Sequence, residues 1–150
     1  MKKLFLTIGL PRSGKSSWSM KQGVPVVNPD AIRLVIHGQA FVREAEPMVW
    51  TIAKYMVKAL FTAGHDNVIV DATNITRKRR DEWNGREWGV ECVNFTTPSA
   101  LCLERAITSG RDDLVPVIKR MARVSTADRE EGIQCLLTPY EATLSIKEGS

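Results

Sequence analysis

GLPRSGKS, residues 9–16, fits the pattern G-x-x-x-x-G-K-S/T and follows directly on an apolar run at residues 4–8. The run predicts a buried strand and the residues after the loop predict a helix, so the loop joins the two. In that position, backbone N–H groups and the positive end of the helix dipole converge on an anion. Gly9 and Gly14 permit the turn and bring no Cβ toward a bound phosphate. The pattern therefore predicts a nucleotide phosphate site.

Position in this loop assigns a role to its polar side chains. Lys15 is expected to reach the β- and γ-phosphates of ATP, and the Ser16 hydroxyl to take a coordination position on Mg²⁺. The alternative is an ordinary glycine-containing turn with Lys15 in solvent, which the flanking strand and helix disfavour. The predicted nucleotide-binding residues of the loop are Gly9, Ser13, Gly14, Lys15 and Ser16.

Composition narrows the class of protein. A chain of 150 residues predicts a single domain, 1–150, and its net charge of +4 suits a polyanionic partner. No apolar run approaches the roughly 18 to 20 residues of a membrane span, so we expect no membrane partner and a cytoplasmic location. Three cysteines without C-x-x-C spacing and two distant histidines indicate neither a disulfide framework nor a zinc site.

Strand and helix patterns alternate along the chain, which predicts an α/β fold: a parallel sheet of about five strands with helices on both faces. No linker or internal repeat interrupts it. The predicted strands are residues 4–8, 24–28, 67–71, 90–96 and 133–137. The predicted helices are residues 15–23, 31–37, 48–63, 77–88, 100–108 and 116–128.

Asp30 and Arg33 follow the second predicted strand, where Asn28-Pro29 ends the extended segment. The carboxyl edge of an open α/β sheet is where ligands bind. Because the two residues are three apart on one helical turn, they can place a general base and a cation side by side. The spacing is equally compatible with an N-cap at Asp30 and a solvated Arg33, so both interpretations stay open.

Asp71 ends the third predicted strand and is a candidate for holding Mg²⁺ through water. Ala72 follows it, whereas ATPase motors typically have a glutamate there that polarises water. No N-K-x-D guanine signature is present either. The sequence therefore favours transfer to an acceptor over hydrolysis or a GTPase switch.

Two groups of basic residues are candidates for binding phosphate. The run at residues 77–80 includes Arg79 and Arg80 and occupies the first turn of a predicted helix, where cations oppose the helix dipole. A solvated face is the commoner explanation of such a run, but its place at the sheet edge favours contact with a nucleic acid backbone. Arg105 and Arg111 bracket a polar loop that could close over the nucleotide or could simply be a surface loop.

Four motifs together resemble the polynucleotide 5′-hydroxyl kinase family, the kinase domain of phage polynucleotide kinase, over residues 2–121. They are G-x-P-x-S-G-K-S, N-P-D-x-x-R, V-D-A-T-N followed by paired arginines and a tryptophan, and V-P-x-x-x-R-M. The resemblance implies strand order 2-3-1-4-5 and a lid at about residues 105–128. It also implies that Asp30 is the general base on a 5′-hydroxyl and that Arg33 binds the acceptor's phosphate.

The resemblance further implies a lid arginine on the γ-phosphate, for which Arg111 is the first candidate and Arg105 the second. The family has D-T-N at the strand tip, whereas this chain has its carboxylate one residue earlier, at Asp71. No D-x-D-x-T phosphatase segment is present, which implies a kinase without that second activity. The predicted acceptor-binding residues are Arg33, Asp71, Thr73, Asn74, Arg79 and Arg80, and Ser16 and Asp71 are the predicted metal ligands.

The sequence thus predicts transfer of the ATP γ-phosphate to the 5′-hydroxyl of DNA or RNA, as in nucleic acid repair. One alternative is a P-loop kinase of a small hydroxyl acceptor such as a nucleoside, a sugar or a drug. Another is a nucleotide-binding regulator without transfer chemistry. The sequence leaves open the preference between DNA and RNA, oligomerisation and the role of Arg12, a long cation inside the loop.

Overall fold

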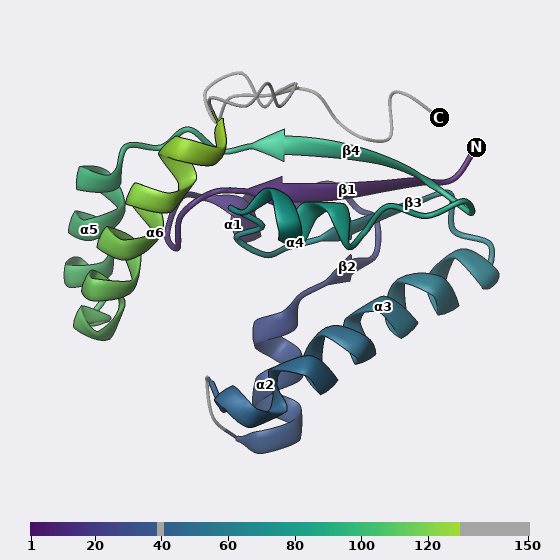
Figure 1. Cartoon of the computed structure of the whole chain (residues 1–150), viewed down its shortest axis with the longest axis horizontal. Helices are drawn as coiled ribbons and strands as arrows, with labels where there is room; N and C mark the ends of the chain where they lie inside the picture. Colours follow the sequence, from purple (N-terminus) through teal and green to yellow (C-terminus); the bar gives the residue numbers. More distant parts are fainter. Residues whose placement is uncertain (39–40, 130–150) are drawn as a thin grey trace.

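The computed structural model describes residues 1–38 and 41–129. Within them, four parallel strands form one sheet in the order β2-β3-β1-β4 (Figure 1). The strands are β1 (Lys3–Ile8), β2 (Val26–Val27), β3 (Asn67–Val70) and β4 (Gly89–Asn94). This order agrees with the first four strands of the predicted sheet. The predicted fifth strand, residues 133–137, lies outside the described residues.

Helices alternate with the strands, as the sequence predicts. They are α1 (Lys15–Lys21), α2 (Pro29–His37), α3 (Glu46–Thr62), α4 (Arg77–Asp81), α5 (Ser99–Thr108) and α6 (Val115–Arg129). Two short 3₁₀ helices are η1 (Arg43–Ala45) and η2 (Asp112–Leu114). Across residues 1–38 and 41–129, no helix is both long and apolar enough to cross a membrane.

The two faces of the sheet bury separate hydrophobic clusters, because side chains alternate along each strand. Leu4 and Leu6 of β1 belong to the cluster on the α3 side, with Val49, Ala53 and other residues of α3. Phe5, between them, belongs to the cluster that contains Trp18 of α1. A third cluster joins α5 and α6 to the loop after β1. The α5/α6 pair therefore stands beyond the carboxyl ends of β1 and β4 (Figure 1).

Thr7 fills the place where β1 and β3 separate. The pairing of β1 with β3 ends at Leu6 and Val70, whereas the pairing with β4 continues for two more residues. The buried Thr7 hydroxyl donates to the Ala72 carbonyl at 2.7 Å and accepts from the Ala72 N–H at 3.0 Å. The Gly9 N–H then donates to the Thr73 carbonyl at 3.1 Å. Residues 71–74, the strand-tip segment, are thereby fastened to the end of β1.

The predicted helix at residues 77–88 is wrong in length, because α4 ends at Asp81. Trp83 is fully buried in the cluster on the α3 side, and Trp88 packs against the same cluster and stacks on Phe61. Residues five apart on an α-helix point about 140° away from each other. A continuous helix could not turn both tryptophans toward α3, so the chain leaves the helix before Trp83.

The second strand is also shorter than predicted, spanning Val26–Val27 instead of residues 24–28. Pro25 precedes it and offers a carbonyl to the Ile69 N–H, but a proline has no N–H to return to the ladder. The helix that follows begins at Pro29 and not after Asp30. Asn28 is its N-cap, and its side chain accepts the Asp30 N–H at 2.8 Å.

We predict that Thr7→Val destabilises the protein by about 1 to 3 kcal/mol, because the partly buried Ala72 N–H and carbonyl lose their shared partner. Urea unfolding measures the effect. The matched control is Thr51→Val on the exposed side of α3, where the hydroxyl donates to the Pro47 carbonyl at 2.8 Å. We expect the control to change stability by less than about 0.5 kcal/mol. Equal effects of the two substitutions would contradict the role of Thr7.

Candidate active site

The loop between β1 and α1 holds Lys15 against uncharged oxygens. Lys15 Nζ donates to the Leu10 carbonyl at 2.6 Å and lies 3.4 Å from Ser13 Oγ. Burial lowers the pKa of Lys15 to about 8, an effect that the charge of Asp71 partly opposes. A desolvated ammonium bound by neutral partners keeps its charge available for an incoming anion.

The two glycines of the loop meet different requirements. A Cβ on Gly9 would lie 2.6 Å from Ser13 Oγ and 3.0 Å from Phe95 Cβ, so a side chain there would collide with the loop itself. Gly14 has open space around it but adopts a φ of 101°, which L residues rarely take. Arg12 also has a positive φ, of 67°, and its carbonyl accepts a hydrogen bond from Arg105.

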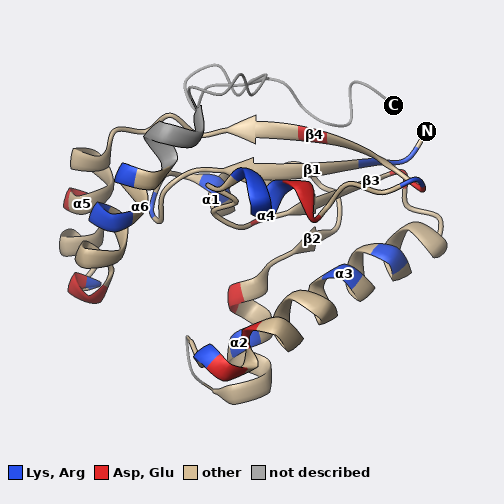
Figure 2. Ribbon diagram, in the orientation of Figure 1, with Lys and Arg blue, Asp and Glu red and all other residues tan. Residues whose placement is uncertain are grey.

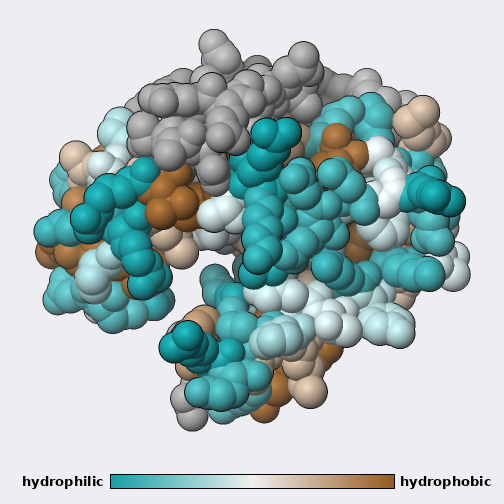
Figure 3. Space-filling model, in the orientation of Figure 1, coloured by the Kyte–Doolittle hydropathy of each residue, from teal (hydrophilic) through white to brown (hydrophobic). Residues whose placement is uncertain are grey.

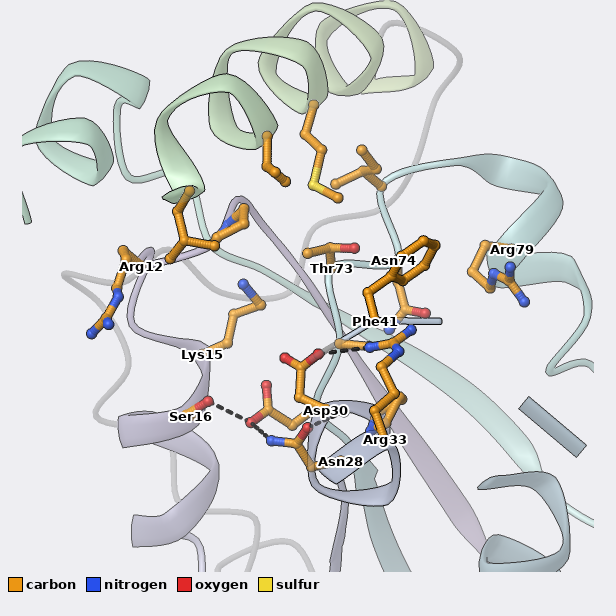
Figure 4. Close-up of a pocket in the computed structure, with 18 of the residues that line it drawn as sticks. Arg12, Lys15, Ser16, Asn28, Asp30, Arg33, Phe41, Thr73, Asn74 and Arg79 are labelled. Atoms are coloured by element: carbon orange, nitrogen blue, oxygen red, sulfur yellow. Dashed lines mark hydrogen bonds and ion pairs between the residues drawn. The ribbon is translucent and has the colours of Figure 1, made fainter. Parts of the chain in front are cut away.

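Ser16 and Asp71 meet at the start of α1. Ser16 Oγ donates to Asp71 Oδ2 at 2.7 Å, and Asn28 Nδ2 lies 3.4 Å from the same oxygen (Figure 4). Burial raises the pKa of Asp71 above its usual range, while the Ser16 hydrogen bond and the charge of Lys15 oppose this rise. A hydroxyl and a carboxylate are hard oxygen donors, which fits Mg²⁺ shared with nucleotide phosphates. The described residues contain no cluster of three or more acidic, histidine or cysteine side chains that would hold a metal unaided.

Asp30 is free of the capping role that the sequence left open, because Asn28 caps α2. Its side chain is 81% exposed and accepts a 2.6 Å hydrogen bond from Arg33 Nη1. Arg33 also donates to Glu46 through Nε and Nη2, at 2.9 and 2.6 Å. Burial works against the charge of Arg33, but the hydrogen bonds and charges of Glu46 and Asp30 raise its pKa above the usual range. Arg33 is therefore a bridge between two carboxylates.

The strand-tip segment carries Thr73 and Asn74 to the same region. Asn74 has a φ of 42°, and its side chain donates to the Thr7 carbonyl at 2.9 Å. Arg80 supports this turn from beneath, since its Nη1 donates to the Asn74 carbonyl at 2.9 Å. Arg80 is buried and does not line the cavity, so the expectation that it contacts substrate is replaced by a structural role.

Arg79 faces the cavity from the same short helix that buries Arg80. Thr76 caps this helix and accepts the Arg79 N–H at 3.2 Å. The Arg79 guanidinium carbon lies 3.9 Å from the centroid of the Trp50 ring, within the range of a cation–π contact. Figure 2 shows the Lys and Arg residues of α4 above α2 and α3. One side of the basic run thus reaches the cavity while the other supports the fold.

The two lid arginine candidates both line the cavity but have different partners. Arg105 Nη1 donates to the Arg12 carbonyl at 3.1 Å, which ties α5 to the phosphate loop. Arg111 forms a bidentate pair with Asp113 at 3.0 and 3.1 Å, on an exposed turn. Arg111 would have to leave Asp113 to reach a phosphate.

The cavity-lining residues named above surround one open cavity of about 1520 Å³, visible as a hollow in Figure 3. Lys15 and Ser16 point into it from the loop side, and Asp30 and Arg33 from the α2 side (Figure 4). Helix α6 adds part of a further wall. The arrangement places a phosphate-binding loop and an exposed carboxylate at one space, with basic residues around it.

Several cavity residues were not predicted from the sequence: Asn28, Phe41, Glu46, Trp50 and Arg120. Asn28 could have been found, because an asparagine before a proline at a helix start is a common N-cap. Glu46 and Trp50 carry no such signal, because their placement depends on how α3 packs against α2.

Comparison with known proteins identifies the family of the chain. The model of the AAA domain matches residues 4–127. A solved chain of the Pnkp1/Rnl/Hen1 complex is similar with a TM-score of 0.62 and 25% identity, over 69% of this chain and 38% of that one. A chain of the Pnkp1/Rnl/Hen1 RNA repair complex has a TM-score of 0.74 and 18% identity, over 87% and 46%. The chain thus spans less than half the length of either relative.

Two small-molecule kinases share the fold over nearly their whole length. A gluconokinase from Sinorhizobium meliloti 1021 has a TM-score of 0.61 and 17% identity, over 97% of this chain and 86% of that one. A shikimate kinase from Acinetobacter baumannii, in complex with shikimate, has a TM-score of 0.58 and 16% identity, over 92% and 82%. No curated protein sequence matches the chain. The predicted resemblance to a polynucleotide kinase domain is confirmed by the similarity to the Pnkp1-containing complexes, and the chain belongs to the AAA domain family with the fold of a P-loop kinase.

Proposed function

We propose that the chain is a single kinase domain that transfers the γ-phosphate of ATP to the 5′-hydroxyl of a DNA or RNA end. The observation that carries the proposal is the position of Asp30. Its exposed carboxylate lines the same cavity as Lys15 and Ser16, and the helix cap at Asn28 leaves it available for chemistry. A nucleotide-binding regulator would have no need of a carboxylate held in this way.

The donor nucleotide would occupy the loop side of the cavity. Backbone N–H groups of the loop and Lys15 would hold its phosphates, with Gly9, Ser13 and Gly14 shaping the loop around them. Ser16 and Asp71 would hold Mg²⁺, which when bound neutralises charge on the phosphates. The hydrogen bond between the Ser16 hydroxyl and Asp71 keeps these two oxygens close together before the metal arrives.

In the transfer step, Lys15 on the loop side of the cavity and Asp30 on the α2 side would act on the same phosphoryl group and acceptor. Asp30 would accept the proton of the acceptor hydroxyl as its oxygen forms a bond to the γ-phosphorus, and the bond from that phosphorus to the ADP oxygen breaks. Lys15 would stabilise the charge on the transferring group. In the lid, at about residues 105–128, Arg111 would do the same after leaving Asp113, with Arg105 as the second candidate.

The acceptor side favours a polynucleotide because the cavity extends past Asp30 to basic and aromatic groups. Arg79 over the Trp50 ring offers a cation to a backbone phosphate, and Thr73 and Asn74 add polar groups beside it. A small neutral acceptor is the second candidate. It is favoured by the pairing of Arg33 with Glu46, which neutralises the cation that contacts Asp30.

We predict that the protein labels oligonucleotides bearing a 5′-hydroxyl but not those bearing a 5′-phosphate, when given labelled ATP and Mg²⁺. Asp30→Asn is expected to lower turnover by about 10²- to 10⁴-fold, the usual contribution of a general base, while ATP binding persists. Asp66→Asn, an exposed change outside the cavity, is the matched control and should behave as wild type. Full turnover in Asp30→Asn, or equal labelling of both oligonucleotides, would exclude this function.

We predict that Arg79→Ala raises KM for an oligonucleotide acceptor and lowers the slope of log affinity against log salt by roughly 0.7 to 1, the share of one phosphate contact. Arg77→Ala on the same helix is the control, because Arg77 pairs with Asp81 outside the cavity. Salt titrations of oligonucleotide binding measure the slope. If both variants keep the wild-type slope, the acceptor is not held through Arg79.

A further inference from the structure

Arg33 has little capacity left for a substrate. Its side chain is only 13% exposed, and all three of its nitrogens already donate to carboxylates. Glu46 takes two of them in a bidentate pair and Asp30 takes the third. Bidentate pairing fixes the plane of a guanidinium as well as its position. The group that the family resemblance assigns to the acceptor's phosphate is therefore held on both sides by acids of its own chain.

Glu46 holds Arg33 from a rigid position in the fold. It is the first residue of α3, where a carboxylate interacts favourably with the helix dipole, and its side chain is 19% exposed. One turn further along, Val49 is fully buried in the main core cluster. The position of Glu46 is thus set by the packing of a 17-residue helix, whereas Asp30 is exposed and has no packing of its own.

The charges of these side chains also argue against a phosphate-binding role for Arg33. Asp30, Arg33 and Glu46 together carry a net charge of about −1, so the triad as a whole does not attract a phosphate. Arg79 stands outside the triad, pairs with Glu82, which does not line the cavity, and presents its guanidinium over Trp50. An acceptor phosphate has a better electrostatic partner in Arg79 than in Arg33.

We propose that Glu46 is a positioning residue, which holds Arg33 and through it fixes the Asp30 carboxylate for proton abstraction. This inference rests on the proposed function, since it gives Asp30 the role of general base. It reassigns Arg33 from binding the acceptor's phosphate to orienting the base. Glu46 touches no reacting atom, and its contribution reaches the reaction only through Arg33.

The test compares Glu46→Gln with Glu44→Gln, an exposed neighbour outside the cavity. Acceptors are a nucleoside with a free 5′-hydroxyl and the same nucleoside carrying a 3′-phosphate. We expect Glu46→Gln to lower kcat about 10- to 100-fold for both acceptors, the scale of a small misplacement of a catalytic group. KM for both acceptors should stay as in wild type. Glu44→Gln should match wild type in kcat and KM.

Arg33→Lys provides the second variant, with thermal unfolding recorded for all variants. Lysine keeps the positive charge but cannot bridge two carboxylates in fixed geometry. A positioning role predicts a loss of kcat with unchanged KM, as in Glu46→Gln, even where folding is intact. A direct phosphate contact predicts instead that Glu46→Gln, by freeing Arg33, lowers KM for the 3′-phosphate acceptor alone.

The possible results distinguish failure of the role proposed for Glu46 from failure of the proposed function. Wild-type transfer that is abolished in Asp30→Asn but unchanged in Glu46→Gln and Arg33→Lys would overturn the role of Glu46 and leave the proposed function standing. A selective fall of KM for the phosphorylated acceptor would also overturn it. Failure of the wild type to phosphorylate any 5′-hydroxyl acceptor would overturn both.

Discussion

The hydroxyl of Thr7 determines how the two halves of the candidate site are joined. Beyond the end of the β1–β3 pairing, the N–H and the carbonyl of the partly buried Ala72 would lose this hydrogen-bond partner without the hydroxyl. An N–H or carbonyl that is removed from water without a partner costs about 1 to 3 kcal/mol, so a polar side chain is favoured at this position. Because Asp71 directly precedes Ala72 and Gly9 lies two residues after Thr7, the same bonds bring the metal-binding candidate beside the phosphate loop.

Three of the four carboxylates that line the cavity, Asp71, Asp30 and Glu46, differ in their surroundings, and this difference separates their roles. Asp71 is buried against Ser16 and Asn28, which suits a ligand whose position must not change. Asp30 is exposed and held by a single guanidinium, which suits a group that exchanges a proton with a substrate. The Glu46 side chain is mostly buried and forms a bidentate pair with Arg33, so its role is to fix the position of Arg33.

The lid region differs from the rest of the site in how it is anchored. Helices α5 and α6 share a cluster with Leu10 of the phosphate loop, and Arg105 reaches the Arg12 carbonyl. The turn that carries Arg111 packs on the same cluster through Leu114, but the Arg111 side chain is exposed and pairs with a neighbouring aspartate. Exposed ion pairs contribute about 1 kcal/mol or less, so a nucleotide phosphate can compete for this arginine at small cost.

The sequence alone was sufficient to predict the phosphate loop, the alternation of strands and helices, and the positions of Asp30 and Asp71 after strand ends. Those features depend on local pattern: apolar period, glycine placement, and residues next in sequence to a strand. It could not separate Arg79 from Arg80, because which of two adjacent arginines turns inward is decided by Trp83 and Asn74 beneath them. Nor could it connect Glu46 to Arg33, thirteen residues apart on different helices. Such pairings depend on the packing of α2 against α3, and only the tertiary structure decides them.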